Sequence, residues 1–306
     1  MEGETRAIFF ITTARSGTQW IHHVLDRLYG DSLVSEHEPI GYDYEPRRSL
    51  RNAEALREIR RRPSVDHHMA GIHQVLKTKN YVEVGFPSCA AAPMLIKEFG
   101  PKLKLVQLTR HPAKVAASLV THQWFGRRRP EIASLVTPHP SDLGVGWPQF
   151  TNRWDDMSRF ERGLYYWGEV HLYGREVEMT YPETPFCRIR FEDLVSDPAQ
   201  QARLHEFMVD GPMPDWRAVA DERIDSYHRK TLHAIKPSTA YRHPEIVTLA
   251  QEFGYSFDET PRSLLRERYV ASSPRQIFAY GLAKAVRASV RVARHVTARR
   301  RNRAGN

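Results

Sequence analysis

An apolar strand that runs through a short polar turn straight into an amphipathic helix is the most constraining feature of this 306-residue chain. Residues 7–11 (AIFFI) are a run of aromatic and β-branched side chains, typical of a strand buried in a parallel sheet. Apolar residues then recur at helical spacing from Ile21 to Leu28. The turn between them directs free backbone N–H groups and the positive end of the helix dipole at one point. This arrangement predicts an anion site in an α/β fold.

The side chains of the turn also suit a phosphate group. Arg15 supplies a fixed positive charge, and Gly17 lets the backbone approach a ligand closely. Ser16 and Thr18 add hydroxyl donors. The pattern Gly-x-x-x-x-Gly-Lys-Ser/Thr is missing, which excludes the usual magnesium-nucleotide cradle of ATPases. The turn is therefore an anion-binding turn of another kind.

A second strand-to-helix turn lies further along the chain. Residues 103–109 predict a strand that ends at Arg110, and Pro112 is well suited to the first turn of the helix that follows. Ser118 lies two turns into that helix. Ligands of open α/β sheets bind at the carboxyl ends of the strands. Two such turns, each with an arginine, predict a ligand that carries two separated phosphates.

Both turns resemble phosphate-binding motifs of the sulfotransferase family. Residues 15–20 (RSGTQW) resemble the family's 5′-phosphosulfate loop, and Arg110 followed by Ser118 matches its 3′-phosphate motif in residue type and spacing. The resemblance implies that the donor is 3′-phosphoadenosine 5′-phosphosulfate (PAPS) and that a sulfuryl group is moved to a hydroxyl or amine acceptor. It also implies that no metal is needed, because the donor is already activated.

Later segments extend the resemblance in the family's order. Residues 190–198 (RFEDLVSDP) are similar to the family's Tyr-Glu-Asp-Leu segment, and residues 235–238 and 249–255 resemble its closing helix region. The resemblance covers residues 5–258 and implies an α/β, P-loop NTPase-like three-layer sandwich with a central parallel sheet flanked by helices. We therefore expect a sulfotransferase domain over residues 1–260.

The resemblance assigns a set of residues to the donor. Arg15 would stand where negative charge grows on the bridging oxygen as sulfate leaves, because that charge requires a cation already in place. Arg110 and Ser118 would clamp the 3′-phosphate, which suits the planar fork of arginine. The complete expected set is Arg15, Ser16, Gly17, Thr18, Gln19, Trp20, Arg110, Ser118, Phe191 and Lys236.

Three of these positions depart from the family's usual residues. Gln19 replaces the second Thr of the loop, which weakens one phosphate contact. Phe191 replaces a Tyr that often contacts adenine, so the ring is kept without its hydroxyl. The Arg-Lys-Gly donor motif is missing, and Lys236 is the expected substitute.

The acceptor must lose its proton to a base within hydrogen-bond reach, and the sequence offers several. The segment SEHEP follows the first helix, where a second strand should end beside the phosphosulfate. Glu36 and Glu38 both fit the catalytic Glu of the carbohydrate and tyrosyl-protein sulfotransferases that the segment resembles. Glu38 is the first choice because its His-Glu-Pro context resembles bacterial members of the family, with Glu36 and His37 as alternatives. Aryl sulfotransferases use a His before the 3′-phosphate strand, but Gly85 stands there and leaves Glu83 as a further candidate. For each acid, a helix cap or a surface ion pair is an equal alternative.

The positive charge of the chain is confined to one end. The net charge is +9, but residues 274–306 contain nine Lys or Arg and no acid, which leaves 36 basic against 36 acidic residues elsewhere. The high pI therefore gives no evidence of a nucleic-acid-binding body, and we expect no nucleic-acid partner. Residues 261–306 are expected to form a basic helical tail. An anionic membrane surface, an acidic partner and plain solvent exposure all remain open for this tail.

Cysteine usage and hydropathy set the expected compartment. Cys89 and Cys187 lack metal-ligand spacing and argue against a disulfide-built secreted protein. The sequence has no run of about 18 apolar residues and no apolar signal region near its start. We therefore expect a bacterial cytoplasmic protein without a metal site, in peripheral contact with a membrane if the tail binds lipid. The oligomeric state is left open.

The middle of the chain bears on the acceptor. Residues 122–160 are rich in proline, glycine and tryptophan, and predict either a lid over the acceptor or a surface loop pinned by its aromatic residues. A glycan, a glycolipid or a small natural product would each serve as acceptor.

Two rival functions remain. One is a P-loop nucleotide kinase-like phosphotransferase, which needs Mg²⁺ and a loop lysine. The other is a non-catalytic membrane- or partner-binding protein with a degenerate nucleotide site.

Overall fold

The computed structural model describes residues 4–126, 134–220, 230–233, 235–258 and 262–271. The predicted basic tail beyond residue 271 and part of the predicted lid, residues 127–133, lie outside the described residues.

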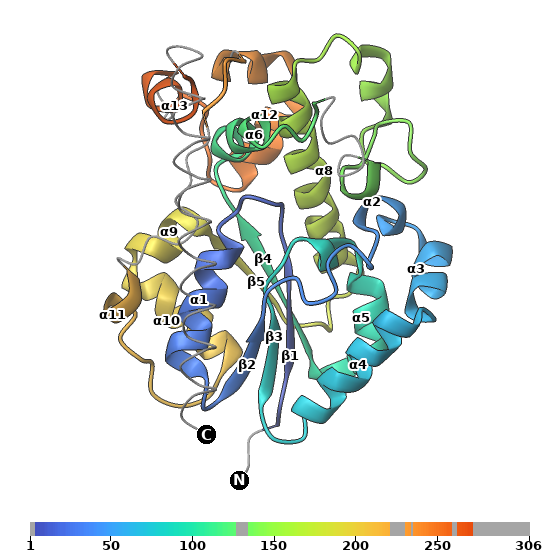
Figure 1. Cartoon of the computed structure of the whole chain (residues 1–306), viewed down its shortest axis with the longest axis vertical. Coiled ribbons are helices and arrows are strands. Elements are labelled where there is room, and N and C mark those ends of the chain that lie inside the picture. The colour runs from blue at the N-terminus through green and yellow to red at the C-terminus, as the bar shows by residue number, and fades with distance from the viewer. Residues whose placement is uncertain (1–3, 127–133, 221–229, 234, 259–261, 272–306) are drawn as a thin grey trace, which may run out of the picture.

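A five-stranded parallel sheet forms the centre of the molecule, with the strand order β2-β3-β1-β4-β5 (Figure 1). The strands are β1 (Ala7–Ile11), β2 (Leu33–Glu36), β3 (Asn80–Glu83), β4 (Leu103–Thr109) and β5 (Phe186–Arg190). The strands predicted at residues 7–11 and 103–109 are confirmed with the same bounds. Because β1 and β4 pair directly, their carboxyl ends lie side by side and bring the two predicted phosphate turns together.

Helices cover both faces of the sheet, which confirms the predicted three-layer α/β sandwich (Figure 1). Successive side chains of β1 point to opposite faces, so Ile8 and Phe10 belong to one apolar cluster and Phe9 and Ile11 to the other. The first face is covered by α1 (Thr18–Tyr29), α9 (Phe191–Ser196), α10 (Pro198–Met208) and α11 (Arg217–Ala220). The second is covered by α3 (Ala53–Arg60), α4 (Pro63–Val75), η1 (Pro87–Ala90) and α5 (Ala92–Phe99), and η2 (Gly100–Lys102) links α5 to β4.

A further group of helices stands beyond the carboxyl ends of the strands (Figure 1). It contains α2 (Pro46–Ser49), α6 (Pro112–Thr121), η3 (Pro148–Arg153), η4 (Pro237–Arg242), α12 (Pro244–Glu252), α13 (Arg262–Tyr269) and the first part of α8 (Arg159–Thr180), whose later turns contact β1 and β4. The long helix α8 begins at a capping box, in which Ser158 and Glu161 satisfy each other's backbone N–H groups. Helix α6 begins with Pro112 in its first turn, as predicted, and packs along α8.

Candidate functional site

The turn between β1 and α1 is held open by two residues in the left-handed region. Arg15 has φ 71° and Gly17 has φ 97°. A Cβ on Gly17 would lie 2.1 Å from Cε2 of Phe191, so only glycine fits against that ring. Inside the turn, the hydroxyls of Thr13 and Ser16 lie 2.7 Å apart, which ties its two ends together. The turn is therefore a preformed loop at the start of a helix.

The two predicted phosphate turns contact each other through their arginines. Nε of Arg15 donates to Oγ of Ser118 at 3.0 Å, and Nη1 of Arg110 donates to the backbone oxygen of Arg15 at 2.8 Å. Thr12 adds a third link, because its hydroxyl donates to the backbone oxygen of Leu108 at 2.8 Å. The two turns thus form one positively charged cluster, although Arg15 and Arg110 are 95 positions apart in the sequence.

Arg110 is held in a setting that suits an anion. Its guanidinium lies over the ring of Phe191, 5.1 Å from the centroid, and burial lowers its pKa. Among the described residues, Nε of Arg110 is buried and has no hydrogen-bond partner. A buried cation with an unused donor is costly unless a charged ligand pairs with it. The residues therefore fit a phosphate placed against Arg110.

Aromatic rings line the cluster on the α1 side. Trp20 contacts Phe191 edge to face, with centroids 5.8 Å apart, and also lies 6.1 Å from Trp216 of the segment before α11. The expected donor residues Trp20 and Phe191 are thus brought together with Arg110. Gln19 is exposed at the surface of α1. Lys236 is exposed at the start of η4, and no described contact joins it to the cluster.

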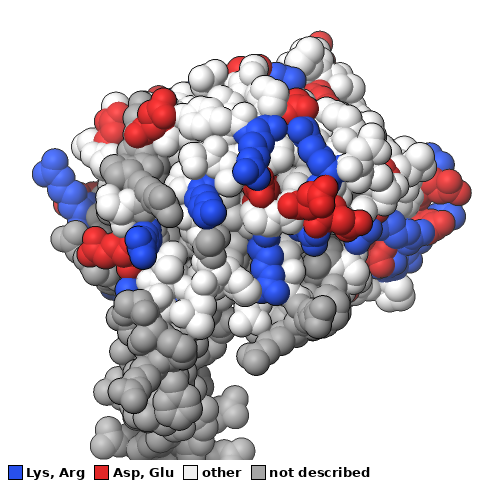
Figure 2. Space-filling view, turned by 90° about the horizontal axis from the view of Figure 1, so that it is seen from above, with Lys and Arg blue, Asp and Glu red and all other residues white. Residues whose placement is uncertain are grey.

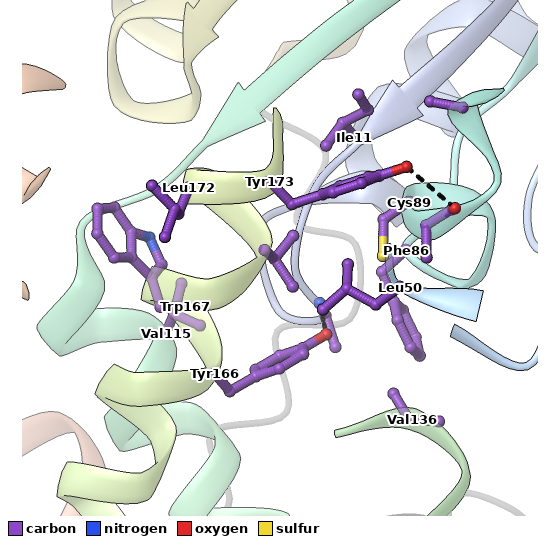
Figure 3. Packing of buried hydrophobic residues seen from close by; sticks show 14 of the residues in the cluster. Ile11, Leu50, Phe86, Cys89, Val115, Val136, Tyr166, Trp167, Leu172 and Tyr173 are labelled. Atoms are coloured by element: carbon purple, nitrogen blue, oxygen red, sulfur yellow. Dashed lines mark hydrogen bonds between the residues drawn. The ribbon is translucent and has the colours of Figure 1, made fainter. Parts of the chain in front are cut away.

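Two buried side chains of helix α8 bond to the backbone of the two turns, a role that no sequence motif indicated. The backbone N–H of Ala14 donates to the hydroxyl of Tyr166 at 3.2 Å, and Nε1 of Trp167 donates to the backbone oxygen of Arg110 at 2.9 Å. Figure 3 shows both side chains reaching from α8 into the core. The signal that could have indicated this role is chemical, because the hydroxyl of a buried Tyr and the indole N–H of a buried Trp each need a hydrogen-bond partner.

Glu192 is a third residue whose role no sequence motif indicated. Its Oε1 accepts hydrogen bonds from Nζ of Lys114 at 3.1 Å and from the backbone N–H of His111 at 3.3 Å. Although burial opposes it, the charges of Lys114 and Arg110 lower the pKa of Glu192. This carboxylate fastens α9, which begins with Phe191, to the start of α6.

The segment after β2 crosses the end of β3 to reach the phosphate turn. In the sheet β3 separates β2 from β1, yet Nε2 of His37 lies 3.1 Å from Oγ1 of Thr18. Glu38 follows with φ 53°, and its Oε1 lies 3.7 Å from Nε2 of His37. A Cβ on Gly85 would lie 2.9 Å from Cγ of Glu38. The side chain of Glu38 therefore fills the space that the missing side chain of Gly85 leaves.

The setting of Glu38 changes its acidity. Burial and the nearby carboxylate of Glu83 raise the pKa of Glu38 to about 7, and Arg15 opposes this shift. A carboxyl group with a pKa near neutrality is suited to take up a proton at physiological pH.

The other two acidic candidates, Glu83 and Glu36, belong to a hydrogen-bond network of their own. Glu83 is fully buried, and its Oε2 accepts from the hydroxyl of Tyr44 at 3.2 Å and lies 2.8 Å from Nε2 of His68. The hydroxyl of Tyr81 donates to Oε2 of Glu36 at 2.7 Å. All the sequence-predicted acids are thus grouped at the ends of β2 and β3, and Glu38 is the one that shares its surroundings with Arg15.

The structure also bears on metals and membranes. Among the described residues, no group of three or more His, Cys, Asp or Glu side chains is arranged to hold a metal ion. Within the same residues, no helix combines the length and the apolar character that crossing a membrane requires. Cys89 and Cys187 are buried free thiols.

Solved structures resemble this chain at low sequence identity. A sulfotransferase from Alicyclobacillus acidocaldarius is 17% identical, with 83% of this chain and 98% of that chain covered and a TM-score of 0.46. A sulfotransferase domain from the curacin biosynthetic pathway is 14% identical, covering 84% and 99%, with a TM-score of 0.44. A mouse sulfotransferase complexed with PAP is 14% identical, covering 86% and 88%, with a TM-score of 0.39.

No curated protein matches this sequence, whereas one protein family does. A family described as "Sulfotransferase domain" matches residues 5–230, which contain both phosphate turns, all five strands and Glu38. On this match, over most of its length, the chain belongs to the sulfotransferase family.

Proposed function

We propose that this protein transfers a sulfuryl group from PAPS to a hydroxyl or amine of an acceptor, and that Glu38 is the base. The observation that carries the proposal is the joined cluster of the two turns, in which Arg15 bonds Ser118 and Arg110 bonds the Arg15 backbone. A donor with one phosphate at each turn uses both arginines. Trp20 and Phe191 then flank its adenine.

The reaction divides into tasks for residues of this chain. Glu38 removes the proton from the acceptor oxygen, whose electron pair forms the new bond to sulfur. The bond from sulfur to the bridging oxygen breaks in line, and its electron pair stays on the 5′-phosphate. Arg15 and the N–H groups at the start of α1 stabilise the negative charge that grows there. The hydroxyl of Thr18, held by His37, supplies a further donor on the same side.

Two features favour Glu38 over the other candidate bases. Its side chain occupies the space at Gly85, where the resemblance to aryl sulfotransferases places a histidine. Its pKa of about 7 leaves a substantial carboxylate fraction at neutral pH and a strong affinity for the proton. Glu83 is instead enclosed by Tyr44 and His68. We propose a glycan, a glycolipid or a small natural product as acceptor.

Calorimetric titration with adenosine 3′,5′-bisphosphate (PAP) tests the donor site. Wild type should bind PAP equally with and without Mg²⁺, because no metal is required. Arg110→Ala should weaken binding about 30- to 150-fold, since a charge-assisted phosphate contact contributes roughly 2–3 kcal/mol. Arg15→Ala should weaken it too.

Arg175→Ala is the matched control, because Arg175 pairs with Glu252 on the surface of α8. Absence of PAP binding in wild type would contradict the proposal. Binding that requires Mg²⁺ would favour a kinase-like phosphotransferase instead.

A further inference from the structure

A pocket with a mixed polar and apolar lining lies between α2 and the segment that leads to η3. It has a volume of about 360 Å³ and is open to solvent on one side. One wall comes from the end of the turn after Glu38 and from α2, and the other from residues 134–143. The lining residues are Glu45, Arg47, Arg48, Asn52, Ser134, Leu135, Asp142 and Leu143.

The pocket adjoins the proposed base through a short series of contacts. Glu38 lies against Gly85, and the next residue, Phe86, contacts the ring of Tyr42 with centroids 6.1 Å apart. Helix α2 packs on η1, which begins directly after Phe86. Tyr42 is 36% exposed and lies in the turns between Glu38 and Glu45, so the chain segment that carries the proposed base leads into one wall of the pocket.

Both walls are tied in place by long-range bonds. The guanidinium of Arg47 donates to both oxygens of Asp142, at 2.7 and 2.6 Å. Behind them, the buried carboxylate of Glu169 accepts from Arg51 at 3.0 Å and from the backbone N–H groups of Gly146 and Trp147 at 2.9 and 2.8 Å. Such a pocket is preformed, so little ordering opposes binding.

The charges of the lining indicate a neutral ligand. Asp142 neutralises Arg47, and Arg48 pairs with Glu45 and Glu58. An anionic or cationic ligand must compete with these pairs, whereas hydroxyl groups can bond to their remaining lone pairs and N–H groups. Figure 2 shows acidic and basic side chains intermixed, without a patch of one sign, on the face of the molecule seen from above.

Two leucines add an apolar surface to this polar lining. Leu143 is 87% exposed and Leu135 is 43% exposed, so both side chains offer carbon surface to a ligand. Hydroxyl-rich edges and an apolar face combine in the ring of a neutral sugar.

We propose that this pocket binds a neutral sugar unit of the acceptor, remote from the hydroxyl that is sulfated. The inference rests on the proposed function and narrows its acceptor to a carbohydrate longer than one residue.

Titration of the full chain with cellobiose, maltose and lactose, followed by saturation-transfer NMR with and without PAP, tests the pocket. We expect binding in the millimolar range and a weaker response from glucuronic acid and from p-nitrophenol. Leu143→Glu should weaken disaccharide binding about tenfold, since it replaces an apolar contact with a charge. Met179→Glu is the matched control, because Met179 is 74% exposed on α8 and does not line the pocket.

A second variant tests the charge argument. Asp142→Asn leaves Arg47 without its counter-charge, so binding of glucuronic acid should rise relative to cellobiose. Absence of disaccharide binding to wild type, equal binding by Leu143→Glu, or preferred binding of p-nitrophenol would each overturn the inference. PAP affinity is measured separately. If wild type does not bind PAP, the proposed function is wrong, but the sugar titration still tests whether the pocket binds a sugar.

Discussion

The proposed donor side and the proposed acceptor side of this site are built in different ways. The donor side consists of two short turns whose residues follow one another in sequence and meet because β1 and β4 are neighbours. The proposed acceptor side joins segments that are just as far apart in the sequence, but it joins them through the ion pair of Arg47 and Asp142 and not through strand pairing. Donor binding is therefore expected to depend on the backbone geometry of the two turns. Acceptor binding is expected to depend on long-range side-chain pairs, which can change without disturbing those turns.

The largest effect should come from the residue where the two sides meet. Glu38→Gln keeps the size of the side chain and removes its ability to take a proton. We expect kcat to fall about 10²- to 10⁴-fold, the usual contribution of a general base. PAP affinity should stay within about twofold, since the donor turns are intact.

Radiolabelled sulfate transfer from PAPS and calorimetry measure these two quantities. Glu36→Gln is the matched control, because Glu36 lies at the end of the neighbouring network. A larger loss in Glu36→Gln than in Glu38→Gln would move the base to Glu36.

The next largest effect concerns the donor side alone. Gly17→Ala introduces a Cβ 2.1 Å from the ring of Phe191, at a residue with φ 97°. We expect PAP binding to weaken at least about tenfold, because strain of roughly 1–3 kcal/mol and a displaced ring both act on the loop.

Gly211→Ala supplies the control for Gly17→Ala, since Gly211 has φ 109° and open space around its Cβ position. It introduces similar backbone strain without a clash. Equal PAP affinity in the two variants would show that the contact with Phe191 is unimportant.

A smaller effect should appear in the pH dependence of catalysis. A base acts when it is deprotonated, so kcat/KM should rise with pH through the pKa of Glu38, about 7. Burial and Glu83 raise this pKa, while Arg15 lowers it; His37 is a further titratable neighbour. Glu83→Gln removes a negative neighbour and should move the rise toward lower pH.

The pH profile of kcat/KM for wild type and Glu83→Gln measures this shift. His68→Gln is a useful companion, because it alters the hydrogen bonding of Glu83 without removing its charge. An unchanged profile in Glu83→Gln would contradict the electrostatic coupling of the two carboxyl groups.

The smallest effect should come from the support behind the donor turn. Tyr166→Phe removes the acceptor for the backbone N–H of Ala14, and Tyr173→Phe removes a donor to the backbone oxygen of Ala90 (Figure 3). Each should lower the free energy of unfolding by about 1–2 kcal/mol. Only Tyr166→Phe should also weaken PAP binding. Denaturant unfolding and calorimetry separate the two effects, and equal PAP affinity would assign Tyr166 to packing alone.

The sequence was most informative where a function depends on neighbouring residues. The strands at residues 7–11 and 103–109 were predicted with their observed bounds, because each is a buried apolar run bordered by turn residues. The grouping of Arg15, Arg110 and Ser118 followed from the rule that parallel strands present their carboxyl ends at one edge. The roles of Tyr166, Trp167 and Glu192 could not be predicted. The sequence pattern shows which residues are buried, but not which hydroxyl, indole N–H or carboxylate forms a hydrogen bond with a distant segment.

The amino-acid sequence by itself determined the α/β architecture and the donor turns, because hydrophobic periodicity and a glycine at a left-handed position act locally. It also determined which acids compete for the role of base. Only the tertiary structure decided how those acids are arranged. Gly85 leaves room that Glu38 fills, and Tyr44 and His68 enclose Glu83. The surroundings of a carboxyl group come from segments far apart in the chain, so burial and pKa emerge only when the chain is folded.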